Sequence, residues 1–154
     1  MNRVIRVSFY FAVLFAFICM GCEKPNPYGI ETHYVEGQVT LDGKPIEDAV
    51  VSFVPKTPGA GEDASGRSKA NGSYKLSSLR GLPESGAMEG EYVITVYKNE
   101  KVDLAVPQKT LDGEAITFEM KNIMPPDYKN PAKSPLKATV VRGKNKINIE
   151  VKSK

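Results

Sequence analysis

Alternation of polar and apolar residues on either side of one tight-turn signal constrains the fold of this chain more than any other feature. Residues 35–41, VEGQVTL, place every second side chain on one face of an extended strand, and residues 49–54, AVVSFV, form a second β-type run. Asp42-Gly43 between them tolerates the positive φ angles of a tight turn, and Pro45 lacks the backbone donor that would extend a ladder. We therefore expect an all-β protein whose later strands pack against these two.

Strand-type runs continue to the end of the chain, at residues 67–70, 73–79, 91–98, 136–141 and 146–152. Asn71-Gly72 predicts a hairpin between the first two of these runs, and residues 142–145 predict a hairpin between the last two. Gly37, inside the first strand of the chain, indicates a bulge or a close backbone approach. About seven short strands separated by turn signals, with no convincing helix, predict a β-sandwich.

One region breaks this regular spacing. Residues 99–122 hold two apolar runs, at 102–106 and 115–118, and form either a small accessory hairpin or a partly mobile loop. Residues 123–135 are punctuated by prolines and cannot form a central strand. Within them, residues 125–128 are compatible with a single helical turn.

The first 21 residues have the composition of an export signal. Arg3 and Arg6 form a positive start, and residues 7–20 form an apolar run rich in phenylalanine. A bilayer crossing takes roughly 20 apolar residues, so this run is too short to span a membrane comfortably. We therefore predict that residues 1–21 are a signal peptide that is removed from the mature protein.

Cys22 defines the type of signal. Residues 18–22, ICMGC, resemble the lipobox of bacterial lipoproteins, in which the cysteine after the cut is acylated and Gly21 is the small residue before it. An ordinary signal peptide would leave Cys22 as a free thiol, but no A-x-A cleavage site lies near the end of the apolar run. The prediction is a lipoprotein in which residues 22–33 form a polar tether and residues 34–152 form the folded domain.

Cysteine usage and charge narrow what the mature domain can do. Acylation of Cys22 and removal of Cys19 leave no cysteine for a disulfide, for thiolate catalysis or for a metal site. The 21 basic residues fall to 19 when Arg3 and Arg6 are removed, against 18 acidic residues. This near-neutral balance, with no basic stripe, argues against a nucleic-acid partner.

The sequence lacks the residue clusters of common catalytic and metal sites. His33 is the only histidine, and because it precedes the first strand we expect it to be solvated and unable to serve in a catalytic triad. No group of zinc ligands occurs. Glu89 and Glu91 form a carboxylate pair, but both flank the start of a strand, where acidic side chains usually face water. We therefore expect no catalytic site, no metal and no cofactor.

The turn and core residues resemble a known family. The matching positions are Gly37, Val39, Asp42, Gly43, Lys44, Pro45, Ile46, Ala49 and Val51, then Asn71, Gly72, Tyr74 and Leu76, then Gly90, Tyr92, Ile94 and Val96. They are similar to the carboxypeptidase regulatory-like domains, which are transthyretin-like, or prealbumin-like, sandwiches. The resemblance implies an all-β, seven-stranded prealbumin-like (Ig-like) β-sandwich over residues 34–152. The tail, residues 125–136, resembles small lipoproteins abundant in planctomycete-type bacteria.

Two active groups of related domains can be compared with this chain. Transthyretin-like hydroxyisourate hydrolases use several histidines, an arginine and a C-terminal tetrapeptide YRGS, whereas this chain has one histidine and ends VKSK. Pilin-type Cna B domains crosslink a first-strand lysine to a last-strand asparagine. Asn148 lies in the last strand here, but residues 35–41 contain no lysine. The resemblance therefore implies a fold and neither of these two chemistries.

An export signal, an anchor at Cys22 and the lack of a catalytic cluster predict a lipid-anchored, non-enzymatic cell-envelope domain. We expect it to serve as a structural or protein-interaction module that faces the periplasm or the cell exterior. Its expected partners are the membrane, through lipid on Cys22, and an envelope protein or a glycan. The alternative is a glycan- or small-ligand-binding domain that uses the loops at residues 56–66, 80–90 and 99–135.

Overall fold

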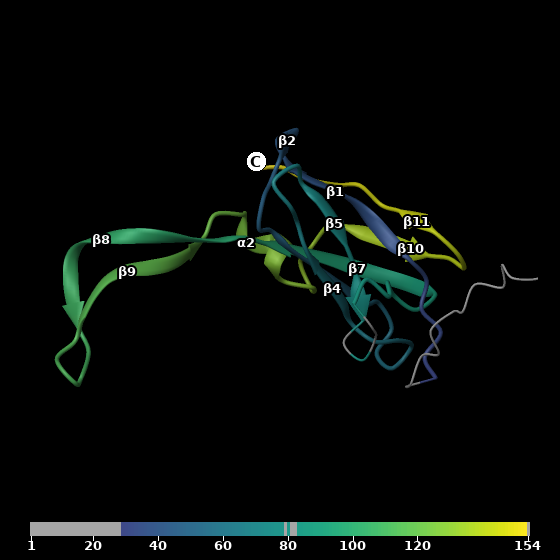
Figure 1. The fold of residues 1–154 in the computed structure, drawn as a ribbon, viewed down its shortest axis with the longest axis horizontal. Coiled ribbons are helices and arrows are strands. Elements are labelled where there is room, and N and C mark those ends of the chain that lie inside the picture. Colours follow the sequence, from purple (N-terminus) through teal and green to yellow (C-terminus); the bar gives the residue numbers. More distant parts are fainter. Residues whose placement is uncertain (1–28, 79, 81–82, 154) are drawn as a thin grey trace, which may run out of the picture.

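The computed structural model of the protein describes residues 29–78, 80 and 83–153. Two five-stranded sheets and a separate two-stranded hairpin make up almost all of its regular structure (Figure 1). The first sheet contains β1 (Val35–Leu41), β2 (Lys44–Pro45), β5 (Ser73–Lys75), β11 (Asn145–Lys146) and β12 (Ile149–Val151). The second contains β3 (Val50–Pro55), β4 (Ala64–Arg67), β6 (Ser77–Ser78), β7 (Gly90–Tyr97) and β10 (Lys137–Val140).

Both sheets contribute apolar side chains to one hydrophobic core. The first sheet supplies Val35, Val39, Tyr74, Ile149 and Val151, and the second supplies Val51, Phe53, Tyr92, Ile94, Val96 and Val140. In β3 the core side chains Val51 and Phe53 are two positions apart, and in β1 Val35 and Val39 lie on the same face with Gly37 between them, as the alternating sequence predicts. The prediction of an all-β sandwich is therefore confirmed.

β1 is the centre of the first sheet. It pairs in parallel with β11 and β12 and antiparallel with β2 and β5. The predicted tight turn joins β1 to β2, where Asp42 and Gly43 have φ angles of 50° and 79°. Because β3 belongs to the second sheet, the two strand-type runs at residues 35–41 and 49–54 contribute to different layers of the sandwich.

Both predicted hairpins at Asn71-Gly72 and at residues 142–145 are wrong. The chain turns at each of these sites, and Gly72 has a φ angle of 75°. However, β4 before Asn71-Gly72 lies in the second sheet, and β5 after it pairs with β1 in the first. In the same way, β10 pairs with β7, whereas β11 pairs with β1. Each turn therefore carries the chain from one layer of the sandwich to the other.

The strands are shorter and more numerous than the seven expected. The predicted run 146–152 is divided at residues 147–148, so that β11 and β12 are separate strands along β1. The run 73–79 is divided at Leu76, with β5 in the first sheet and β6 in the second. The predicted strand 67–70 lies three residues earlier in the chain, as β4.

Residues 99–122 form a hairpin, one of the two alternatives left open by the sequence. Its strands are β8 (Asn99–Lys109) and β9 (Ala115–Asn122), and they project away from the sandwich (Figure 1). The helical turn expected among the prolines is present as α2 (Pro126–Lys129). Asn122 fastens the base of the hairpin, because its side-chain oxygen accepts hydrogen bonds from the backbone N–H groups of Lys98 and Met124, each at 3.2 Å.

His33 belongs to the folded domain, so the expectation that it is solvated is wrong. Its backbone N–H donates to the Ala87 carbonyl at 2.7 Å and its carbonyl accepts from the Ala87 N–H at 3.0 Å, which leaves the residue 8% exposed. Gly86 permits this bridge, since a Cβ there would overlap the His33 carbonyl oxygen.

The predicted signal peptide, the acylation site Cys22 and most of the predicted tether lie outside the described residues. Within the described part of the chain, no helix is both long enough and apolar enough to cross a membrane.

Candidate functional site

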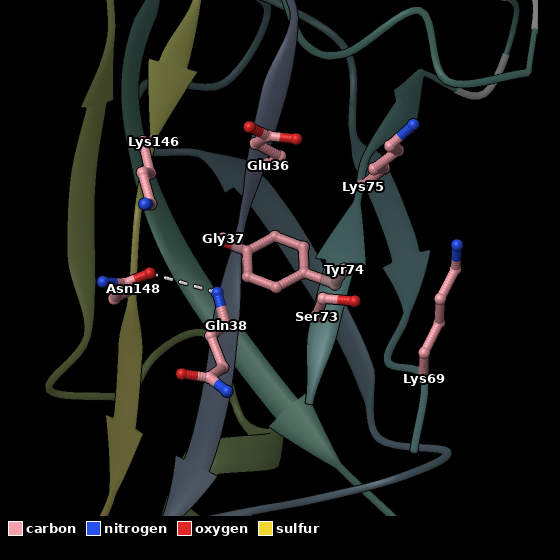
Figure 2. A pocket seen from close by; sticks show the side chains of 9 residues that line it. All are labelled: Glu36, Gly37, Gln38, Lys69, Ser73, Tyr74, Lys75, Lys146 and Asn148. Atoms are coloured by element: carbon pink, nitrogen blue, oxygen red, sulfur yellow. Dashed lines mark hydrogen bonds between the residues drawn. The ribbon is translucent and has the colours of Figure 1, made fainter. Parts of the chain in front are cut away.

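Two surface features could support binding, and the first is a shallow groove of about 320 Å³ on the first sheet (Figure 2). β1 provides Glu36 and Gln38, β5 provides Ser73 and Lys75, and the β11–β12 segment provides Lys146 and Asn148. Lys69, just before β5, completes the basic side of the groove (Figure 2). Because these residues come from three strands far apart in the sequence, no local motif predicted the groove.

A gap in the β1–β11–β12 ladder underlies the floor of the groove. The Ile147 N–H donates to the Glu36 carbonyl, but the Ile147 carbonyl accepts a 2.7 Å bond from the Tyr74 hydroxyl. The next donor of β1, the Gln38 N–H, is then satisfied by the Asn148 side-chain oxygen at 3.1 Å (Figure 2). Two side chains thus replace ladder bonds that the backbones would otherwise make.

Gly37 confirms the predicted close backbone approach at this gap. A Cβ at this position would overlap the carbonyl oxygen of Ile147 and lie 3.0 Å from the Tyr74 ring. Burial raises the pKa of the Tyr74 phenol above its ordinary value of 10.0, so the hydroxyl remains a proton donor to Ile147 at neutral pH.

The groove is lined by three lysines, Lys69, Lys75 and Lys146, and by one carboxylate, Glu36. Lys75 lies 2.8 Å from the Glu84 carboxylate; this contact raises the pKa of Lys75 and lowers the pKa of Glu84. Lys69 and Lys146 have no ion-pair partner among the described residues. The groove therefore offers the solvated ammonium groups of Lys69 and Lys146, the Gln38 and Asn148 amides and the Ser73 hydroxyl, beside the Glu36 carboxylate. The two ammonium groups can hold an anionic group loosely.

The loops proposed for ligand binding do not form one surface. Residues 56–63 follow β3, and residues 80 and 83–89 precede β7, so both loops lie at the end of the second sheet where Pro55 pairs with Tyr92. Arg80 and Glu62 join these two loops, with 3.2 Å between Nε and Oε1. The hairpin follows Tyr97 and therefore lies at the opposite end. The predicted binding surface is divided between the two ends of the sandwich.

The structure also places the carboxylate pair and Asn148, which were considered from the sequence. Glu89 and Glu91 are both exposed, as expected, and the Lys56 ammonium 2.8 Å from Glu91 lowers the pKa of that carboxyl. Asn148 is exposed and lies between β11 and β12, where its side-chain oxygen accepts from the Gln38 N–H of β1. In the described ranges, no group of three or more histidine, cysteine or acidic residues is placed to hold a metal ion.

The hairpin is the second feature, and it gathers most of the exposed apolar surface. Eight large apolar side chains are exposed in the described part of the molecule, and six of them belong to the hairpin: Val102, Val106, Leu111, Ile116, Phe118 and Met120. None of them contributes to the core of the sandwich. Soluble domains rarely gather large apolar side chains on one exposed element unless it contacts a partner. The sequence showed the two apolar runs but not that they would be solvent-exposed.

Comparison with known proteins identifies no family. No family model and no curated protein matches this chain. Two solved structures resemble it. One is a 9R-lipoxygenase from Cyanothece PCC8801, with 13% identity and a TM-score of 0.39; the match covers 79% of this chain and 16% of the lipoxygenase chain. The other is a DUF3823 family protein from Parabacteroides merdae ATCC 43184, with 14% identity and a TM-score of 0.36; the match covers 79% of this chain and 46% of that chain. This chain spans less than half the length of either one. Likenesses this weak carry no argument about function, and the resemblance to carboxypeptidase regulatory-like domains stays a prediction.

Proposed function

We propose that this protein is a lipid-anchored, non-enzymatic interaction module of the bacterial cell envelope and that the β8–β9 hairpin is its contact element. The observation that carries the proposal is the concentration of exposed apolar side chains on the projecting hairpin. Val106 and Met120 are 74% and 58% exposed, values that burial against a partner protein would lower.

The chemistry of the chain supports binding rather than catalysis. His33, the only histidine, is buried, and its backbone is bonded to Ala87. Tyr74, the tyrosine that lines the groove, donates its hydroxyl hydrogen to a backbone carbonyl, and burial raises its pKa so that it stays neutral. The Tyr74 hydroxyl is therefore not available to activate a nucleophile, and His33 is largely withdrawn from solvent.

The hairpin is also held in a fixed direction, which suits a docking element. Asn122 bonds both Lys98 and Met124 at its base, and the Lys98 ammonium lies 2.8 Å from the Glu100 carboxylate. The side chains of β9 are thus presented at one end of the sandwich rather than on a loose loop.

Replacing Cys22 with serine tests the anchor. A serine cannot carry the thioether-linked lipid, so the Cys22→Ser protein is expected to leave the membrane fraction for the soluble fraction. Immunoblotting of fractionated cells measures this shift, with Ser8→Ala in the predicted signal as the control that should remain membrane-bound. If the Cys22→Ser protein stays in the membrane fraction, the anchor is not a lipid on this cysteine.

Photo-crosslinking tests the contact element. A photoreactive amino acid in place of Met120 is expected to give discrete adducts in intact cells, because this side chain lies on the hairpin. Val141 is the matched control, since it is 53% exposed and apolar but lies on the sandwich. Adducts from Met120 and none from Val141 support the proposal. Equal labelling from the two positions, or none from Met120, would contradict it.

A further inference from the structure

The two edges of the hairpin differ in how they are protected against pairing. β8 contains Pro107, four charged residues and a register shift between Asp103 and Gln108. Proline, charge and bulges are the devices that natural proteins use to block edge-to-edge association. β9 has the sequence AITFEMKN, with two charged residues of opposite sign, Glu119 and Lys121, but with no proline and no bulge of its own. One edge is therefore blocked and the other is left open.

The open edge presents backbone groups at known positions. Ile123 donates its N–H to the Lys98 carbonyl at 2.9 Å. In an antiparallel pair the backbone N–H and C=O groups face the partner strand at every second residue, so those of Lys121 and Glu119 also face β8. The intervening residues Phe118, Met120 and Asn122 consequently direct their N–H and C=O groups away from β8, towards the open edge. Among the described residues, no strand pairs with β9 along this edge.

The charges along β9 are complementary to a second copy of β9 in only one two-fold register. An antiparallel pair centred on Met120 places Glu119 of each copy opposite Lys121 of the other, giving two symmetric ion pairs. Neither side chain has an ion-pair partner elsewhere in the described structure. A pair centred on Glu119 would instead place two identical carboxylates opposite each other.

A register centred on Phe118 is also disfavoured. It would require Ile116 to direct its backbone outward. On the turn side of the register shift, however, Thr110 donates its N–H to the Glu114 carbonyl at 2.9 Å. The backbone groups of Ile116, two residues from Glu114, therefore face β8 and not the open edge. The regular outward-facing segment is therefore 118–122, whose central residue is Met120.

We propose that β9 pairs antiparallel with β9 of a second copy of this chain, about a two-fold axis at Met120. The inference rests on the proposed function, because it names the partner of the same hairpin. It joins two hairpins into a four-stranded sheet in the order β8, β9, β9, β8. Both outer edges of that sheet are β8 strands with Pro107 and the register shift, so the assembly closes as a dimer and does not grow into a fibre.

Disulfide trapping of the full-length chain in its membrane tests this register. Position 120 faces its own copy across the axis, with about 5.5 Å between the Cα atoms, so Met120→Cys should give a disulfide-linked dimer under mild oxidation. Ala115→Cys is the matched control on the same strand; its two copies would lie roughly 34 Å apart and should not link. The unsubstituted chain, with its native cysteines, sets the background.

Charge exchange provides the second measurement. In the Met120→Cys background, Glu119→Lys or Lys121→Glu places like charges opposite each other twice per dimer and should weaken association at least about fivefold. The double exchange Glu119→Lys with Lys121→Glu restores both ion pairs and should restore the dimer. Failure of the double exchange to recover the dimer overturns the proposed register.

The outcomes separate this inference from the proposed function. If Met120→Cys yields no more dimer than Ala115→Cys, self-pairing is wrong. In that case a photo-adduct from Met120 to a different protein would leave the hairpin as a contact element. If neither the disulfide nor any photo-adduct forms at Met120, both proposals fall.

Discussion

Replacing Gly37 with alanine is expected to destabilise the sandwich by about 3 kcal/mol or more. The added Cβ would overlap the carbonyl oxygen of Ile147, and this obstacle is backbone rather than the end of a flexible side chain. β1 and the β11–β12 segment would have to separate, which breaks the parallel pairing on one side of the central strand. Urea unfolding followed by tyrosine fluorescence measures the loss, since the chain has seven tyrosines and no tryptophan.

Gly61→Ala is the matched control for this substitution. A Cβ at Gly61 would meet the Tyr92 hydroxyl at 3.4 Å, an ordinary contact, so the change in unfolding free energy should stay within about 0.5 kcal/mol. A Gly37→Ala protein as stable as Gly61→Ala would mean that the backbones do not approach closely at Gly37.

Replacing Tyr74 with phenylalanine is expected to cost about 1–3 kcal/mol at neutral pH. The ring is kept, but the Ile147 carbonyl loses the hydroxyl that donates to it at 2.7 Å. Because the Ile147 carbonyl is half-buried, the cost combines the loss of this bond with the incomplete solvation of the acceptor that remains. Chemical unfolding at pH 7 measures the difference between the two proteins.

The same substitution should change how stability depends on alkaline pH. Burial raises the pKa of Tyr74 in the folded protein, whereas the unfolded chain releases that proton at about 10.0. The contribution of Tyr74 is therefore complete below pH 10 and is lost as the pH rises through the folded-state pKa, by up to about 1.4 kcal/mol per pH unit. The parent should lose stability more steeply above pH 10 than Tyr74→Phe, as followed by circular dichroism. Parallel curves would show that Tyr74 ionises freely in the fold.

The sequence predicted β1 and β7 well because alternation is a local property. Residues 35–41 became β1 with the predicted bounds, and residues 91–98 lie almost wholly in β7. Turn chemistry was also correct in its local geometry, as the φ angles of Asp42 and Gly43 show. These features depend only on neighbouring residues, so one sequence is enough to predict them.

The sequence could not predict which sheet each strand joins. Asn71-Gly72 reverses the chain, but a reversal is compatible with pairing in the same sheet or with crossing to the facing one. His33 was misplaced for a similar reason, because its partner Ala87 is more than fifty residues away and no local pattern relates the two. Non-local pairing decides both cases.

The candidate contact surface was visible only in part. The apolar runs at residues 102–106 and 115–118 were recognised, but such runs normally indicate core strands. Their exposure follows from where the hairpin leaves the sandwich after Tyr97, a feature set by the whole fold. The lysines of the groove, Lys69, Lys75 and Lys146, come together only through the register of the first sheet.

Removing the hairpin tests the central claim most directly. Joining Asn99 to Asn122 through a short Asn-Gly turn deletes residues 100–121, none of which contributes to the core, so the sandwich should remain folded. The measurement is the size of the particle that carries the protein after mild detergent extraction of membranes. The full chain is expected in a particle at least twice the mass of its monomer, and the shortened chain is expected as a folded monomer. Particles of the same size for both chains would show that the hairpin is not the element through which this protein acts.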